Sequence, residues 1–153
     1  MANTGLNGRA ITTKRFFGQR TEVSIHIDAP TQKIWELLTD VTRFASWNST
    51  VLEMTGQISV GGRIALRSTL APQRTFKLKV KEFEPPTRLS WGDAMGTRVF
   101  VLTPAERGGT HFSMSESIGG PLFPLFARLI PSFDASFEQF AADVKKAAQD
   151  RVQ

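Results

Sequence analysis

The C-terminal third of the chain contains a run of regularly spaced aromatic residues. Five of the 12 phenylalanines lie within residues 123–140, and together with Ile130 and Val144 they recur every three or four residues. This spacing predicts one apolar stripe along a helix. Such a wide stripe needs a large apolar partner, and residues 51–118 have the pattern of strands. We therefore predict a long aromatic helix laid across a sheet, with Pro131 kinking or splitting that helix.

The composition limits what the chain can be. Its 153 residues fit one domain with a substantial core, and the lack of cysteine excludes disulfides, thiol catalysis and cysteine-ligated metals. The 19 basic and 14 acidic residues give a net charge of +5, which favours anionic surfaces without selecting a partner. No apolar run approaches the ~20 residues that a membrane span needs. We expect a flexible basic tail over residues 1–20, a single domain over residues 21–150 and a cytoplasmic location.

Alternating and turn-bounded segments predict the sheet. Apolar and polar residues alternate from Val23 to Ile27, which indicates a half-buried strand, and residues 34–41 and 42–47 predict two short helices after it. Six further strands follow between turn signals, and their short connections are typical of antiparallel neighbours. We predict an α+β fold in which a seven-stranded antiparallel curved sheet wraps around the long C-terminal helix, with two short helices between strands one and two.

Strand parity and hairpin turns predict which side chains meet on the inner face of the sheet. A turn at Met95-Gly96 would bring Asp93 opposite Arg98, and the next hairpin would bring Arg98 opposite Glu116. Glu82 is predicted to be a further inward acid. Two interpretations of the arginine between two carboxylates stay open. It is either a self-satisfied structural ion pair, since buried charges need partners, or a cluster that orients a ligand.

The same parity predicts an apolar wall, in which Leu66 pairs with Leu78 and Trp91 with Phe100. With the helix residues and the charged trio, this wall defines the candidate ligand-binding residues: Leu66, Phe76, Leu78, Trp91, Asp93, Arg98, Phe100, Phe112, Met114, Glu116, Phe126, Ile130, Phe133 and Phe137. Each apolar member could equally be ordinary core, because an aromatic stripe at helical spacing usually is.

Patterns for catalysis and metal binding are missing from the sequence. His26 and His111 fall on the outer face without a clear carboxylate partner, no serine–histidine–acid triad follows, and the glycine pairs lack phosphate-loop spacing. We expect no catalytic residue, no metal and no cofactor. Basic residues are predicted on the outer face of the sheet: Arg63, Arg67, Lys77, Lys79, Lys81 and Arg88. That face is either simply solvated or a docking surface for anionic membrane or nucleic acid, although no aromatic residues interleave with the basic ones.

Several loose motifs follow one another between residues 22 and 149. They are Ile27-Asp28-Ala29-Pro30 before Ile34-Trp35, FASWN at 44–48, FEPPTRLSW at 83–91, GTHFSMSE at 109–116 and FAADVK at 140–145. In this order and spacing the chain resembles the START-like (SRPBCC) superfamily, in particular its polyketide cyclase/dehydrase-like branch, whose fold is the helix-grip. The resemblance implies a cavity between sheet and helix for a hydrophobic small molecule such as a lipid, sterol or polyketide. It implies little about chemistry, because members range from carriers to cyclases.

The leading prediction is a non-catalytic protein that binds a hydrophobic small molecule. One alternative is a polyketide cyclase or aromatase that uses Arg98 with Asp93 or Glu116 to handle protons. Another is an interaction module that docks through the basic outer face of the sheet. No nucleic-acid partner is expected, transient contact with a membrane is compatible with the prediction, and the oligomeric state is open.

Overall fold

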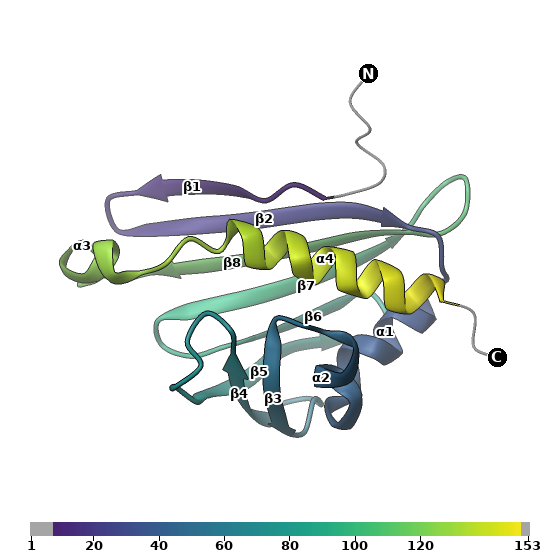
Figure 1. Ribbon diagram of the computed structural model, residues 1–153, viewed down its shortest axis with the longest axis horizontal. Coiled ribbons are helices and arrows are strands. Elements are labelled where there is room, and N and C mark those ends of the chain that lie inside the picture. The colour runs from purple at the N-terminus through teal and green to yellow at the C-terminus, as the bar shows by residue number, and fades with distance from the viewer. Residues whose placement is uncertain (1–7, 151–153) are drawn as a thin grey trace.

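One antiparallel sheet curves around a C-terminal helix (Figure 1). The structure is a computed structural model and describes residues 8–150. The strands are β1 (Ile11–Arg15), β2 (Gly18–Ile27), β3 (Val51–Gly56), β4 (Arg63–Ser68), β5 (Phe76–Glu84), β6 (Arg88–Gly92), β7 (Gly96–Pro104) and β8 (Thr110–Gly119). The helices are α1 (Thr31–Thr39), η1 (Val41–Arg43), α2 (Phe44–Trp47), α3 (Phe123–Phe126), η2 (Ala127–Leu129) and α4 (Asp134–Gln149).

The sheet confirms the predicted meander and the predicted fold class. Its eight strands lie in the order β1-β2-β8-β7-β6-β5-β4-β3, and all neighbours are antiparallel. β3 to β8 follow one another in space as in sequence, whereas β2 pairs with β8 and so joins the two ends of the chain. α4 crosses the face of the sheet, and α1 and α2 lie beside its C-terminal end (Figure 1).

The sheet has one strand more than predicted, because β1 lies in the stretch expected to be a flexible tail. The side chains of β1 are mostly exposed, so its sequence shows no apolar alternation. Backbone hydrogen bonds to the edge of β2 hold β1 in place. It is also bound to α4: Thr12 Oγ1 donates to Asp134 Oδ1 at 2.5 Å, and the Ala10 N–H donates to Glu138 Oε2 at 2.9 Å. The part of the tail prediction that concerns residues 1–7 lies outside the described residues.

The aromatic C-terminal segment forms two pieces, as Pro131 predicted. η2 ends at Leu129 and α4 begins at Asp134, with Pro131 in the extended link between them. On α4 the stripe faces the sheet, and both Phe137 and Phe140 are 1% exposed. The prediction that the stripe on α4 faces the sheet is therefore correct, but the aromatic residues belong to two separate helical pieces, α3–η2 and α4.

Aromatic rings fill the centre of the space between α4 and the sheet. The ring of Phe140 has its centroid 6.0 Å from that of Phe44, 5.7 Å from that of Phe100 and 6.5 Å from that of Phe112. Trp91 lies 4.9 Å from Phe100, and all five side chains are at most 2% exposed. Ring pairs at such distances add about 0.5–1.5 kcal/mol each beyond the burial of their area. This ring cluster is the centre of the core.

The predicted pairing of β5 with β6 is confirmed where Val80 lies opposite Trp91. The predicted pairing of β4 with β5 is wrong, because Leu66 lies opposite Phe76 instead of Leu78. The shift is by two residues, since the loop between these strands turns earlier than its sequence signals indicated. A shift of two keeps every side chain on its predicted face, because side chains alternate with a period of two.

Helical structure follows β2 as predicted, although α1 ends at Thr39 and the second predicted helix consists of η1 and α2. Asp40 separates α1 from η1, and its Oδ1 accepts hydrogen bonds from the Thr42 backbone N–H at 3.1 Å and from Thr42 Oγ1 at 2.7 Å. The bond from the Thr42 hydroxyl is the main reason that the pKa of Asp40 lies below its ordinary value. The ionised side chain therefore caps the start of η1.

Candidate functional site

An arginine and a glutamate form an ion pair on the inner face of the sheet. Arg98 of β7 and Glu116 of β8 are direct cross-strand partners, as the sequence predicted. Arg98 Nε donates to Glu116 Oε1 at 2.8 Å, and the two side chains are 16% and 20% exposed. Most other inward positions are apolar, so this charged pair needs an explanation.

The N-terminal half of α4 covers the pair. The guanidinium of Arg98 lies over the ring of Phe137, 4.9 Å from its centroid, and 5.8 Å from the centroid of Phe140. A cation over an aromatic face is attracted by the ring quadrupole, so α4 holds the guanidinium in place. Of the five N–H donors of Arg98, only Nε–H makes a hydrogen bond to another described residue.

A polar row extends from this pair across four strands, comprising Thr12, Thr21, Glu116 and Arg98. Successive members are register partners on β1, β2, β8 and β7. Thr12 Oγ1 lies 2.8 Å from Thr21 Oγ1 and 2.5 Å from Asp134 Oδ1. Because an ionised carboxylate only accepts, Thr12 donates to Asp134 and Thr21 donates to Thr12. The sequence prediction missed Thr12 because residue 12 was assigned to the tail, and it therefore missed Asp134, which bonds Thr12. The alternation of Thr21 with Val23 and Ile25 was the available sign that position 21 faces inward.

Asp93 does not join this row, which corrects the predicted trio. The register between β6 and β7 differs by two residues from the prediction, so Trp91 lies opposite Arg98 instead of Phe100. Asp93 is part of the turn, where its Oδ1 accepts from the backbone N–H groups of residues 95 and 96 at 2.8 and 3.0 Å. A short aspartate side chain that bonds the backbone two residues ahead stabilises a turn, and this preference fixed the hairpin.

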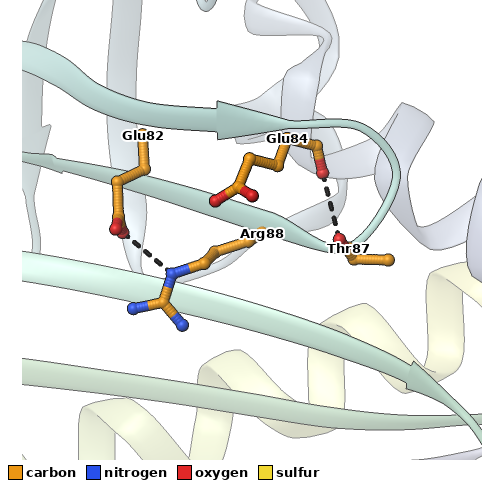
Figure 2. Close-up of polar contacts among 4 residues, drawn as sticks. All are labelled: Glu82, Glu84, Thr87 and Arg88. Atoms are coloured by element: carbon orange, nitrogen blue, oxygen red, sulfur yellow. Dashed lines mark hydrogen bonds and ion pairs between the residues drawn. The ribbon is translucent and has the colours of Figure 1, made fainter.

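Glu82 lies on the outer face, contrary to the prediction. A β-bulge between Val80 and Glu82 interrupts the alternation of β5. Beyond the bulge, Glu82 accepts from Arg88 Nε at 3.0 Å, as Figure 2 shows, and these side chains are 40% and 42% exposed. In the adjoining turn, Thr87 Oγ1 donates to the backbone carbonyl of Glu84 at 3.3 Å (Figure 2). The bulge removes Glu82 from the candidate site.

The apolar candidates divide into a core group and a half-buried group. The core group is Leu66, Trp91, Phe100, Phe112, Met114, Phe133 and Phe137, which are all at most 9% exposed. The half-buried group is Phe76, Leu78, Phe126 and Ile130. This second group lies toward the end of the sheet where β6 turns into β7 and β8 leads to α3. Space for a ligand is to be sought at that end, because rings fill the centre.

Two surface hollows lie elsewhere on the molecule. One, of about 200 Å³, is lined by Arg9, which precedes β1, and by residues of the β1–β2 hairpin, including Arg20 and Glu22. The other, of about 310 Å³, lies where β1, β2 and β8 end, around Gly18 and Ile118. Neither is lined by a predicted ligand-binding residue, so a cavity between sheet and C-terminal helix remains a prediction.

The outer face of the sheet carries no metal cluster within residues 8–150. His26 and His111 lie directly opposite each other there, on β2 and β8, and both are exposed. No group of three histidine, aspartate or glutamate side chains that could hold a metal forms around them or elsewhere in that range. In the same range, no helix is long and apolar enough to span a membrane.

The sequence profile of the family described as "Polyketide cyclase / dehydrase and lipid transport" matches residues 18–149. The chain belongs to this family. The match begins at Gly18, the first residue of β2, so β1 precedes the matched region. No curated protein sequence matched the chain. Membership in the polyketide cyclase/dehydrase family supports a ligand-binding or cyclase-like protein.

Solved structures share the fold of this family member. MLL2253 from Mesorhizobium loti is 22% identical with a TM-score of 0.65, over 84% of this chain and 95% of that one. EF2215 from Enterococcus faecalis is 17% identical with a TM-score of 0.65, over 90% of this chain and 75% of that one. BexL, a di-domain ARO/CYC from the BE-7585A biosynthetic pathway, is 12% identical with a TM-score of 0.66, over 91% of this chain and 52% of BexL. At these identities the likeness shows the fold alone.

Proposed function

We propose that the protein binds a hydrophobic small molecule, such as a lipid, a sterol or a polyketide-like compound, between the inner face of the sheet and the C-terminal helical segments. The observation that carries the proposal is the Arg98–Glu116 pair, which sits on an apolar inner face with donors of Arg98 left unused. Binding sites for small molecules are mostly apolar and contain a few polar groups that fix orientation.

The half-buried group supplies the apolar part of this site. Phe76 and Leu78 lie on β5 beyond the end of β6, and Phe126 and Ile130 come from the segment between β8 and α4. A ligand that covered them would remove their remaining apolar surface from water, which contributes about 25 cal/mol per Å² before the costs of ordering. Micromolar affinity therefore needs no covalent chemistry.

The polar pair is hard to explain by stability alone. Taking an arginine and a glutamate out of water is costly, and apolar residues of similar volume are often as stable or more stable in their place. The next inward position on β8 is Met114, fully buried and apolar, so the sheet accommodates such a residue nearby. The proposed role of Arg98 is to donate to a carbonyl, hydroxyl or carboxylate oxygen of the ligand while Glu116 keeps the guanidinium in position.

Native mass spectrometry of freshly purified protein tests for a co-purified hydrophobic molecule. A direct test is the fluorescence of cis-parinaric acid, whose polyene is apolar and whose carboxylate suits Arg98. Arg98→Met should weaken its binding about tenfold, as expected for one charge-assisted hydrogen bond. Leu78→Gln should also weaken binding, whereas Arg88→Met on the outer face should not. The proposal fails if folded protein binds no probe, or if Arg98→Met and Leu78→Gln leave binding as unchanged as the Arg88→Met control does.

The second candidate function is cyclase-type chemistry, because the fold is shared with BexL, described as an ARO/CYC, and Glu116 would be its acid–base residue. With Asp93 in a turn, Glu116 is the carboxylate that remains beside Arg98. A guanidinium keeps its proton at neutral pH, so Glu116 would have to accept the substrate proton. Incubation with a linear poly-β-ketone thioester, followed by liquid chromatography and mass spectrometry, should then show cyclised product that Glu116→Gln abolishes. Equal product yield with and without protein would exclude this function for that substrate class.

A further inference from the structure

Exposed apolar side chains gather at one end of the molecule. Nine large apolar side chains are exposed in residues 8–150, and six of them belong to three neighbouring segments. We call these six the apolar end: Phe16, Phe17, Met95, Leu122, Leu125 and Leu129. Scattered single apolar residues are normal on protein surfaces, but a contiguous group marks an interaction site.

Backbone hydrogen bonds hold the three segments together. The N–H of Gly120, just before α3, donates to the carbonyl of Phe17 in the β1–β2 turn at 3.0 Å. The N–H of Gly119 donates to the carbonyl of Met95 in the β6–β7 turn at 3.1 Å. Figure 1 shows the β1–β2 turn and α3 at the same end of the molecule. The three segments therefore lie together at one end of the molecule (Figure 1).

α3 and η2 have an apolar side that no described residue covers. Phe123 is buried at 3% exposure and anchors the segment, and its ring lies 5.7 Å from that of Phe126. On the other side, Leu125 and Leu129 are 81% and 82% exposed. In the β1–β2 turn, the rings of Phe16 and Phe17 contact each other edge to face at 4.6 Å, yet both are exposed. One side of this short helical segment packs on the domain through Phe123, whereas the apolar side chains on its other side, Leu125 and Leu129, are left in contact with solvent by the described residues.

Exposed basic residues surround the apolar end. Lys14 and Arg15 precede the β1–β2 turn, and Arg128 lies in η2; within the described part of the chain, none of the three forms an ion pair. Arg20 is also exposed and pairs with Glu22 at 2.5 Å. The acid of the β6–β7 turn, Asp93, is half-buried and occupied by backbone N–H groups. The segments of the apolar end thus combine exposed apolar side chains with flanking basic ones.

From this arrangement we propose that the apolar end docks on the surface of an anionic lipid bilayer. Exposed phenylalanine and leucine side chains insert among lipid headgroups, and flanking arginine and lysine side chains are attracted to anionic lipids. A second copy of the chain fits less well, because a two-fold contact would place the same positive rim against itself. This docking does not depend on the proposed ligand, although it would bring the half-buried group close to a source of hydrophobic molecules.

Vesicle co-sedimentation tests the proposal with the full chain. Vesicles of phosphatidylcholine alone should bind little protein, and vesicles of equimolar phosphatidylcholine and phosphatidylglycerol should bind it in a salt-sensitive manner. Phe16→Ser combined with Leu125→Ser should abolish the binding. Arg15→Gln combined with Arg128→Gln should weaken it about 30-fold, from about one kilocalorie per basic residue.

Matched controls come from the opposite edge of the sheet and from its outer face. Val60→Ser combined with Leu52→Ser changes exposed apolar residues in the β3–β4 loop and on β3, the edge strand farthest from β1, and should leave binding unchanged. Lys77→Gln combined with Arg63→Gln changes the outer face and should have a smaller effect than the pair at the apolar end. Circular dichroism confirms that each variant is folded.

Three outcomes would overturn the proposal. The first is folded protein that binds neither vesicle. The second is binding that only the outer-face variant weakens, which would assign contact to the basic sheet face. The third is a concentration-dependent dimer, seen by light scattering, that Phe16→Ser with Leu125→Ser dissociates while vesicles stay unbound; in that case a second copy covers the apolar end.

Discussion

The protein contains two Arg–Glu pairs of similar geometry on opposite faces of the sheet, and they should differ in coupling energy. Arg98 and Glu116 lie 2.8 Å apart and are 16% and 20% exposed. Arg88 and Glu82 lie 3.0 Å apart and are 42% and 40% exposed. Double-mutant cycles with arginine replaced by methionine and glutamate by glutamine measure each pair within one fold.

Exposure sets the expected magnitudes. Two unit charges ~4 Å apart attract by about 1 kcal/mol in water and by about 4 kcal/mol at an effective dielectric constant of ~20. The outer pair is close to the first limit, and exposed pairs typically contribute about 0–1 kcal/mol. The inner pair is closer to the second limit, but part of its attraction offsets the cost of removing both groups from water. We expect coupling energies of about 2 kcal/mol for the inner pair and below about 1 kcal/mol for the outer pair.

Urea unfolding of the wild type, the single variants and the double variant of each pair gives the coupling energies, provided that the dependence on urea concentration stays constant within each set. The attraction of Arg98 to the ring of Phe137 is lost in the single variant and the double variant alike, so it cancels from the cycle. High salt should reduce the outer coupling more than the inner one. The reasoning is refuted if the two couplings are equal or if the outer one is larger.

Three further predictions follow from local packing and hydrogen bonding. Phe140→Ala should lower the free energy of unfolding by about 4 kcal/mol in urea titrations, because the ring is 1% exposed at the centre of the ring cluster; a loss below about 2 kcal/mol would contradict that packing. Gly56→Ala should cost about 3 kcal/mol, since φ is +109° and a Cβ would collide with the backbone of β4, whereas Gly61→Ala, with φ of +69° and open space, should cost only about 1 kcal/mol. Thr42→Val should raise the pKa of Asp40 toward its ordinary value in an NMR titration, and an unchanged titration would show that the threonine is not the cause. Because the folded-state pKa is lowered, the ionised cap stabilises the protein at neutral pH, and this stabilisation is lost as the pH falls through that pKa.

The fold was predictable where periodic apolar residues and turn residues agree. Alternation over Val23–Ile27 and the stripe of α4 predicted faces that the structure confirms, because burial on one face imposes a period on the sequence. β1 was not predictable in this way, since an edge strand needs only backbone partners and carries few apolar residues. Its sequence of threonine and basic residues is equally compatible with a tail.

The candidate site was predictable only in part. The pairing of Arg98 with Glu116 followed from the glycine-containing loop between β7 and β8, whose register was correct. Asp93 and Glu82 were misplaced by two local features, a side chain that bonds its own turn and a β-bulge. The turn of Asp93 leaves the apolar pattern of its strand unchanged. The bulge does leave a signal, because apolar residues at 76, 78 and 80 are followed by Phe83 instead of an apolar residue at position 82. Thr12 could be assigned only after β1 was known.

The pairing of β2 with β8 has a consequence for how the chain is made. Ile27 ends the strand and faces Thr110, so roughly 80 residues must be synthesised before this pairing can begin, which takes roughly 4–16 s on a ribosome. Throughout that interval the first hairpin has an open strand edge and an uncovered apolar face. The later strands can pair in order as they emerge, but the sheet closes only when β8 arrives, and α4, which follows β8 in the sequence, covers it last. The first part of the nascent chain is therefore the part that waits longest for its partners.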